Sequence, residues 1–412
     1  MTPRLKPVGS EARNLRTTAI GETVMPVVKI VLSVDIIRPP LAGIGHYTLQ
    51  LARGLRADPA VTDLRYFSTY RWLADPESAL VAGPSLHQAR RWLPCKPQVA
   101  LLYGALQSRW FRRQVERFPD HLLHVPNFIL PPCANPTVVT LHDLSHLHYP
   151  QFHPRERIVY LERYLPQTLQ QATRLIAVSE FVRQEIITLL GVAPERIVTV
   201  HNGVDPAFHP YSSIELAPVL SRHGLQAGSY LLAVATLEPR KNLGRLAEAY
   251  GGLPATLRQR YPLVLVGARG WLTEALEQQL APLERCGQLR RLGYVPQEDL
   301  PRLYAGAHAF AYPSLYEGFG LPVLEAMSCG IPVLTANRAS LPEVAGDATL
   351  LVNPEDVDAI AAGLERLLTD QEWRAGAVQR GLQQAGRFSW TRCIKETIAV
   401  YQRNSETKIN VH

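Results

Sequence analysis

Short runs of apolar, β-branched residues alternate with segments of helical length along almost the whole chain. Apolar runs with few polar interruptions are typical of parallel strands, because helices bury both faces of a parallel sheet. On this basis strands are predicted at residues 27–35, 122–126, 137–143, 174–179, 197–202, 230–236, 263–267, 289–294, 309–313, 332–336 and 349–352. The pattern therefore predicts an α/β fold built from doubly wound parallel sheets.

The alternation breaks over residues 205–228, where prolines and serines gather. A chain of 412 residues exceeds the usual size of one hydrophobic core. We therefore expect two Rossmann-like domains, at residues 25–212 and 213–390, with a ligand in the cleft at the carboxyl ends of their strands. Residues 1–24 are expected to form a loose polar extension. A C-terminal helix within residues 391–412 would pack on its own domain or cross back to the first.

The composition excludes several classes of protein. No apolar run is long enough to span a bilayer, and residues 1–24 lack the apolar segment of a secretory signal. The five cysteines are scattered without a Cys-x-x-Cys pair, which argues against a disulfide framework or a zinc site and indicates a cytoplasmic location. The net charge of +7 permits an anionic partner, whether a nucleotide, a lipid head group or a nucleic acid.

The most informative segment runs from Glu317 to Glu325, Glu-Gly-Phe-Gly-Leu-Pro-Val-Leu-Glu, directly after the strand predicted at 309–313. Its glycines precede a proline that suits the first turn of a helix, so free backbone N–H groups would face a phosphate or a sugar hydroxyl. Both glutamates could reach one elongated ligand, and a carboxylate there would accept hydrogen bonds from a vicinal diol such as a ribose. The alternative is an ordinary helix N-terminus with favourable acidic residues.

Two adjacent cations, Arg240 and Lys241, follow the first strand predicted for the second domain. At the carboxyl end of that strand they would face the cleft and neutralise a phosphate, Arg with a planar fork and Lys with a point charge. The alternative is a solvated basic turn.

Two features of the first domain also fall at strand ends. Gly43 and Gly45 open a predicted helix and would let a ligand approach the backbone, although Thr48 replaces the third glycine of a dinucleotide-binding fingerprint. His142 ends the strand predicted at 137–143, where it would hydrogen-bond a sugar hydroxyl or an acceptor. A metal site built from this and the neighbouring histidines, His146, His148 and His153, is the weaker interpretation, because no acidic or cysteine partner has ligand spacing.

A basic stretch lies in the first half of the chain. Residues 85–120 contain seven Lys or Arg and two acidic residues, and arginines alternate with Trp110 and Phe111 between Arg109 and Phe118. A basic amphipathic helix with aromatic residues suits an anionic membrane surface. The alternative is a helix packed on the core with a solvated face.

Taken together, these motifs resemble the family 4 glycosyltransferases, which share the two-domain fold called GT-B. The resemblance covers residues 27–401 and is closest to the bacterial mannosyltransferase B-like subgroup. It rests on Gly43-Ile44-Gly45-His46-Tyr47, His142-Asp143, Ala177-Val178-Ser179-Glu180-Phe181, Asn202-Gly203-Val204-Asp205, Glu238-Pro239-Arg240-Lys241-Asn242, Gly293-Tyr294-Val295 and the Glu317–Glu325 pair.

The resemblance implies a retaining, metal-independent hexosyltransferase without a cofactor. Its donor would be a nucleotide-diphosphate sugar, with GDP-mannose as the expected one, and its acceptor a glycan or a lipid-linked glycan in polysaccharide or glycoconjugate biosynthesis. It also implies cytoplasmic work, at the inner face of the membrane if Arg109–Phe118 docks there, and no nucleic-acid partner. A nucleotide-sugar epimerase of the same fold and a non-catalytic sugar-binding protein are the alternatives.

By the same resemblance, Arg240 and Lys241 would neutralise the diphosphate, Glu325 would hold the ribose, Glu317 would grip the donor sugar and His142 would touch it. Backbone groups would complete the donor site. Its expected members are Gly43 and Gly45 at the phosphates, Tyr294 and Val295 beside the base, and Gly318, Phe319, Gly320 and Leu321 at the sugar. Two residues depart from the family pattern, Thr236 where an arginine is common and His201 where a proline is common.

Overall fold

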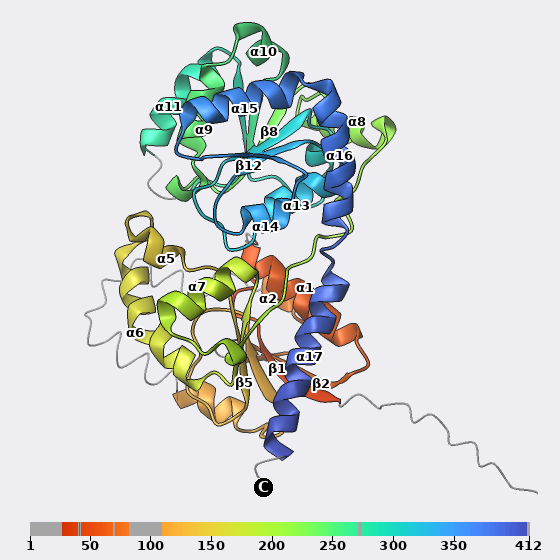
Figure 1. Ribbon diagram of the computed structural model, residues 1–412. Coiled ribbons are helices and arrows are strands. Elements are labelled where there is room, and N and C mark those ends of the chain that lie inside the picture. The colour runs from red at the N-terminus through yellow and green to blue at the C-terminus, as the bar shows by residue number, and fades with distance from the viewer. Residues whose placement is uncertain are drawn as a thin grey trace, which may run out of the picture.

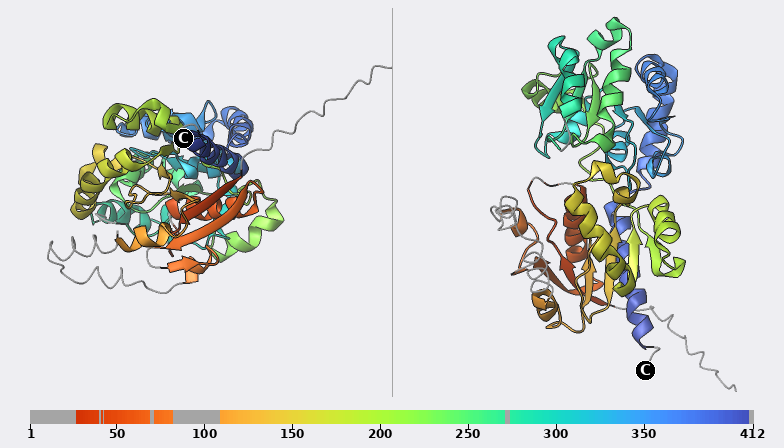
Figure 2. Two further views of the ribbon diagram at one scale, coloured as in Figure 1. Left: turned by 90° about the horizontal axis from the view of Figure 1, so that it is seen from below. Right: turned by 90° about the vertical axis from the view of Figure 1, so that its left-hand side faces the viewer.

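A computed structural model describes residues 27–39, 41, 43–68, 71–81, 109–270 and 274–409. Figure 1 shows two α/β domains stacked one above the other, each with a central sheet covered by helices. The right-hand view of Figure 2 shows the same two domains from the side. The predicted extension at residues 1–24 lies outside the described residues.

The N-terminal domain contains a seven-stranded sheet with the strand order β3-β2-β1-β4-β5-β6-β7. All neighbouring strands pair in parallel except β2 and β3, which are antiparallel. Its strands are β1 Val28–Ser33, β2 Val61–Ser68, β3 Arg71–Leu73, β4 Leu122–Val125, β5 Thr137–Leu141, β6 Arg174–Ala177 and β7 Ile197–Thr199. Its helices include α1 Gly43–Ala57, α2 Ser78–Val81, α5 Ser145–His148, η1 Pro150–Phe152, α6 Arg155–Gln171, α7 Glu180–Leu190 and η2 Pro194–Arg196.

The C-terminal domain contains a six-stranded, wholly parallel sheet with the order β10-β9-β8-β11-β12-β13. Its strands are β8 Leu231–Val234, β9 Leu263–Val266, β10 Leu289–Gly293, β11 Ala309–Tyr312, β12 Val333–Ala336 and β13 Leu350–Val352. Its helices are α8 Ser213–Arg222, η3 Pro239–Lys241, α9 Leu243–Gly251, α10 Ala255–Arg260, α11 Glu274–Arg285, α12 Leu300–Ala305, α13 Leu321–Ser328, α14 Leu341–Ala345, α15 Val357–Thr369 and α16 Gln371–Ala385.

Every strand predicted from an apolar run is present, and β4, β5, β9, β11 and β12 are buried at each position. This confirms the predicted doubly wound fold. The hairpin of β2 and β3 was not predicted, because β2 lies near the sheet edge and keeps polar residues such as Asp63 and Arg65 among its apolar ones. The stretch predicted as a break at 205–228 contains a helix, α8, whose N-terminus is closed by a capping box between Ser212 and Glu215.

The last helix, α17 (Trp390–Ile409), packs on the N-terminal domain beside α1, as Figure 1 shows. A Cβ at Gly54 of α1 would lie 2.4 Å from Ile394, so the two helices are in close contact. Lower on α17, the Tyr401 hydroxyl lies 2.6 Å from Nδ1 of His124 on β4. The chain thus passes between the domains twice, and the two passages run side by side where Val204 N donates to Phe388 O. None of the described helices meets the length and apolarity needed to cross a bilayer.

Candidate active site

Glu317 lies at the centre of a buried charged cluster at the carboxyl ends of β8 and β11. Its Oε1 accepts hydrogen bonds from Lys241 Nζ at 2.8 Å, Tyr312 OH at 2.9 Å and Ser314 Oγ at 2.6 Å. Its Oε2 lies 3.4 Å from Nη1 of Arg240. The structure therefore brings together three residues that the sequence singled out, Glu317, Arg240 and Lys241.

The cluster fixes the charge of its members. Burial alone would raise the pKa of Glu317, but Lys241 and Arg240 outweigh it and lower that pKa to about 2. Burial likewise disfavours the Arg240 cation, yet Glu317 and Glu238 raise its pKa above the ordinary value. The side chains of Arg240 and Lys241 are only 15% and 12% exposed, so the alternative of a solvated basic turn is wrong.

Arg240 also ties this cluster to the loop that carries Glu317. Its Nη2 donates to Oε1 of Glu238 at 2.7 Å, and its Nη1 donates to the carbonyl oxygen of Tyr316 at 2.7 Å. The backbone carbonyl of Arg240 in turn accepts from Leu315 N at 2.9 Å. These bonds preorganise the cations before any ligand binds, which is what electrostatic stabilisation of a leaving group requires.

The loop after Glu317 presents unused backbone donors. Within the described part of the chain, the N–H groups of Gly318, Phe319 and Gly320 donate no hydrogen bond. Gly320 caps α13 with a φ of 111°, and Leu321 begins the helix. Free amides at a helix N-terminus favour an anion or a hydroxyl oxygen.

Gly318 lies against the other domain. A Cβ at this position would lie 1.6 Å from the carbonyl oxygen of His142, so only glycine fits between the two domains. The predicted donor loop and the predicted N-terminal histidine therefore meet at this point.

His142 is buried and turned toward its own domain. Its Nε2 lies 3.2 Å from the carbonyl oxygen of Pro126, and its ring meets the edge of Tyr47 at a centroid distance of 4.8 Å. Burial lowers its pKa to about 4, so the imidazole is neutral at physiological pH. The predicted contact between His142 and a sugar stays a prediction.

The neighbouring histidines have separate partners. His148 pairs with Glu185 at 2.5 Å, while Nε2 of His153 lies 3.0 Å from Ser145 Oγ. In the described ranges no group of three or more His, Cys, Asp or Glu is arranged to hold a metal ion. The weaker interpretation of these histidines as a metal site thus gains no geometric support, and independence from metal stays a prediction.

Glu325 lies one turn into α13 and is partly buried. Burial raises its pKa to about 7, against the lowering effect of the nearby Tyr304 hydroxyl, so it exchanges its proton near neutral pH. Asp205, from the segment that joins the domains, raises that pKa further.

The remaining predicted donor contacts differ in accessibility. Tyr294 is 61% exposed, whereas Val295 belongs to the core of the C-terminal domain, so its predicted contact with a base would be through the backbone. Apart from its chain neighbours and the backbone of its own helix, no described atom lies within 4 Å of the place where a Cβ of Gly43 would be. A Cβ at Gly45 would instead crowd Leu41 at 3.0 Å, so this glycine also serves the packing of its own loop.

The basic stretch is partly described. Residues 109–115 are helical, and Phe111 and Val115 are buried beneath β2, with the Phe111 ring 5.3 Å from that of Phe67. The expectation that Phe111 contacts a membrane is therefore wrong, because its side chain fills the core. Trp110 and the arginines at 109, 112 and 113 are exposed, while residues 90, 91 and 96 lie outside the described part of the chain. Docking on an anionic membrane stays a prediction.

Three residues that hold the site were not predicted: Tyr312, Ser314 and Ser340. Tyr312 and Ser314 lie within five residues of Glu317 on the same strand end, so their spacing was a usable signal. Ser340 lies 23 residues away, and its Oγ contacts the carbonyl oxygens of Glu317 and Phe319, both at 2.8 Å. Only the fold brings it there.

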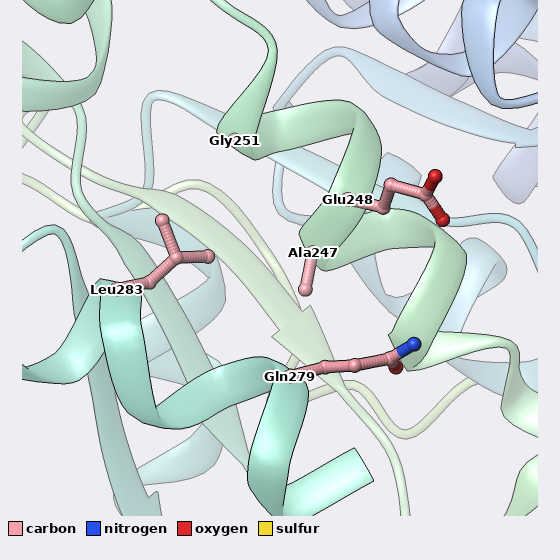
Figure 3. Close-up of a pocket in the computed structure, with 5 residues that line it drawn as sticks. All are labelled: Ala247, Glu248, Gly251, Gln279 and Leu283. Carbon is pink, nitrogen blue, oxygen red and sulfur yellow. The ribbon is translucent and has the colours of Figure 1, made fainter. Parts of the chain in front are cut away.

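A depression on the outer surface is unrelated to this cluster. Figure 3 shows it between α9 and α11, lined by Ala247, Glu248, Gly251, Gln279 and Leu283. Two of these side chains are apolar, one is a glycine, and none contacts the Glu317 cluster. We assign it no role in the site.

Both domains of the chain match known families. Residues 41–208 match the family model "Glycosyltransferase Family 4", and residues 224–384 match "Glycosyl transferases group 1". The chain is 42% identical over 378 residues to the O-antigen chain mannosyltransferase B of Escherichia coli, which covers 91% of this chain and 99% of that relative.

Solved structures of low sequence identity share the fold. Sucrose-phosphate synthase from Thermosynechococcus elongatus aligns with a TM-score of 0.70 at 20% identity, over 92% of this chain and all of the other. HepE from Anabaena, in complex with UDP and glucose, aligns with a TM-score of 0.68 at 18% identity, over 91% of this chain and all of the other. With both domains matched and a relative aligned over nearly its full length, the chain belongs to the family 4 glycosyltransferases and has the GT-B fold.

Proposed function

We propose that this glycosyltransferase moves a mannosyl residue from GDP-mannose to a growing glycan in polysaccharide biosynthesis, with retention of configuration and without a metal ion. The likeness to an O-antigen chain mannosyltransferase supports the sugar and the type of acceptor. The UDP bound to HepE supports a nucleoside diphosphate as the leaving group. The same donor chemistry would serve a free glycan or a lipid-linked one.

The observation that carries the proposal is the buried cluster of Arg240 and Lys241 beside free backbone amides. Negative charge grows on the diphosphate as its bond to the anomeric carbon breaks, and fixed cations in a water-poor site stabilise that charge. Glu317 holds both cations in place and neutralises one of them before the donor arrives. Donor binding would bring two or more negative charges to a cluster that is already arranged to receive them.

The chemical step follows from these positions. The bond from the anomeric carbon to the β-phosphate oxygen breaks, and its electron pair stays on that oxygen. The acceptor hydroxyl forms the new bond from the same face of the sugar, and its proton passes to the departing phosphate oxygen. No protein nucleophile is needed, which distinguishes this route from the paired carboxylates of retaining glycosidases.

Glu317 and the loop amides would orient the sugar during this step. The N–H groups of Gly318, Phe319 and Gly320 would donate to sugar hydroxyls. Oε2 of Glu317 would accept a hydrogen bond from one of these hydroxyls. Glu325, when ionised, would accept hydrogen bonds from the ribose diol. The neutral imidazole of His142 would meet the sugar from the N-terminal domain.

A donor screen tests the proposal. The purified enzyme would be mixed with GDP-mannose, GDP-fucose, UDP-glucose or UDP-galactose and a mannose-terminated acceptor, with Lys241→Ala as the control for contaminating activity. We expect transfer from GDP-mannose and a rise in melting temperature with GDP, because a ligand that binds only the folded state stabilises it. Preference for a uridine donor would refute the proposed donor. Epimerised donor without transfer would identify an epimerase, and binding without turnover a sugar-binding protein.

A further inference from the structure

Helix α7 of the N-terminal domain receives three groups from the C-terminal domain. Oγ of Ser179, the N-cap of α7, donates to the carbonyl oxygen of Gly318 at 2.7 Å. The Glu343 carboxylate accepts from the N–H groups of Glu180 at 2.8 Å and Phe181 at 3.1 Å. One turn further along, Glu185 accepts from the hydroxyl of Tyr316 at 2.5 Å.

Tyr316 belongs to the C-terminal domain by sequence and to the N-terminal domain by its contacts. Its ring lies among His148, Tyr149 and Phe181, with centroid distances of 5.3, 6.2 and 5.9 Å, and the residue is 4% exposed. Its hydroxyl also accepts from Leu144 N at 3.0 Å. The residue therefore fills a socket in the opposite domain, and both hydrogen-bonding functions of its hydroxyl are used there.

The main chain of Tyr316 faces the reaction site. Its carbonyl oxygen accepts from Arg240, and the next residue is Glu317, the centre of the charged cluster. Any movement of the Tyr316 side chain out of its socket would be passed on to the residues that hold the cations. The position of the cluster is thus coupled directly to the contact between the domains.

Glu343 makes the second contact between the domains. It lies on α14, accepts hydrogen bonds from the first two N–H groups of α7 and pairs with Nε2 of His201 at 2.6 Å. Burial would raise the pKa of Glu343, but the hydrogen bond from His201 and those from the two amides lower it, so the carboxylate is ionised. The positive end of the α7 dipole stabilises this charge.

We propose that Tyr316 and Glu343 are positioning residues that dock the donor loop, residues 317–320, against α7 and so hold the domains in the closed arrangement in which transfer occurs. Each makes its contacts across the domain boundary, so each stabilises the closed arrangement over an open one. Between them lies Gly318, which no larger residue could replace at the His142 carbonyl. The roles of the cluster itself rest on the proposed function, whereas the docking contacts exist without a donor.

The test compares Tyr316→Phe and Glu343→Gln with Tyr250→Phe. Tyr316→Phe keeps the ring in its socket and removes only the hydroxyl. Glu343→Gln keeps the shape but can accept from one of the two amides and must turn its NH₂ group toward the other. Tyr250 is the matched control, because its buried hydroxyl lies 3.0–3.1 Å from the carbonyl oxygens of Arg258, Tyr261 and Gln288, to any one of which it can donate, and all three belong to its own domain.

Three readouts separate docking from general stability: the radius of gyration, kcat and the ratio of released to transferred hexose. Small-angle X-ray scattering of the ligand-free enzymes measures the radius of gyration, which we expect to increase in the two docking variants and not in the control. With donor and acceptor, kcat should fall about tenfold in each docking variant, the effect of losing one hydrogen bond to a charged group. Released free hexose should rise relative to transferred hexose, because an open site admits water. Tyr250→Phe should lower the melting temperature and leave the radius of gyration, kcat and the ratio of released to transferred hexose unchanged.

The outcomes are distinguishable from a failure of the proposed function. An unchanged radius of gyration with unchanged partition between hydrolysis and transfer in both docking variants would overturn the inference. A loss of kcat equal in all three variants would assign Tyr316 and Glu343 to ordinary packing and would overturn it as well. If the donor is not GDP-mannose, the scattering result still holds, because it requires no donor.

Discussion

The two domains share one architecture and differ sharply in charge where they face each other. At the strand ends of the C-terminal domain, Arg240, Lys241, Glu238 and Glu317 form a compact set of buried ion pairs. At the strand ends of the N-terminal domain, burial lowers the pKa of His142 to about 4, and the residue is neutral. The next residue, Asp143, is a carboxylate whose pKa, despite burial, is lowered by Arg240 of the opposite domain. Two sheets of the same kind thus present a pair of cations on one side and a neutral imidazole beside an anionic carboxylate on the other.

The difference teaches how this fold divides the reaction. A diphosphate is stabilised by fixed cations, which the C-terminal domain supplies and holds in place with its own carboxylates. The N-terminal side, with neutral His142 and anionic Asp143, can meet a sugar and an acceptor by shape and hydrogen bonds without attracting the leaving group. If this division is correct, changes to the cations of the C-terminal side should affect turnover most.

Lys241→Ala should have the largest effect. It removes a cation from the leaving group and a partner from Glu317, so kcat should fall by about 10²–10³, the usual loss for one such electrostatic donor. KM for the donor should change less, because the charge develops in the transition state. Steady-state kinetics would measure this, with Lys29→Ala, an exposed lysine on β1, as the matched control. If Lys241→Ala raised only KM, the result would contradict the role assigned to the cations of the C-terminal domain.

Glu325→Gln should have a smaller effect, on donor binding. The amide accepts hydrogen bonds from a diol less strongly than a carboxylate, so KM for the donor should rise about tenfold with little change in kcat. In the wild type, donor affinity should improve as pH rises through about 7, where Glu325 ionises, and the variant should lack this dependence. The exposed Glu372→Gln on α16 is the control. A pH-independent KM in the wild type would contradict the assignment.

The stability of Glu325→Gln relative to the wild type should depend on pH. The pKa of Glu325 is raised from 4.5 to about 7 in the folded chain, so its contribution to the free energy of unfolding is full below pH 4.5 and is lost as pH rises to about 7. The melting temperature of Glu325→Gln should therefore increase relative to that of the wild type across this window. Calorimetry at several pH values would show it. A constant difference between the two proteins would mean that Glu325 is not the titrating group.

The sequence predicted the strands well because most are buried on both faces and read as unbroken apolar runs. It also predicted that Arg240, Lys241 and Glu317 would converge, since the carboxyl ends of parallel strands share one edge. The sequence could not predict β2, because its charged residues obscure the alternation of apolar and polar residues that is typical of a half-buried strand. Nor could it predict that Phe111 faces the core. A helix with arginines and aromatic residues has the same sequence pattern whether its apolar side packs on a sheet or on a lipid surface.

The contacts between the domains were beyond the sequence for a different reason. Tyr316 and Glu185 are 131 residues apart, and Glu343 and His201 are 142 apart. Their pairing depends on how two complete domains are set against each other. His201 was noted as a departure from the family pattern without an explanation, and the structure supplies one: it is the partner of Glu343.

Removal of divalent metal should have no effect, and this is the smallest expected change. If the cations of the C-terminal domain neutralise the diphosphate, dialysis against EDTA should leave kcat and KM as they were. The alternative would place a metal ion on the N-terminal side, near the histidines that follow β5. Burial lowers the pKa of His142 and of His146 to about 4, so both are neutral and capable of binding a metal. The EDTA assay therefore distinguishes a metal ion at these histidines from the cations of the C-terminal domain. Loss of activity with EDTA, restored by Mn²⁺ or Mg²⁺, would break the comparison between the domains, because leaving-group stabilisation would then depend on an ion and not on Arg240 and Lys241 alone.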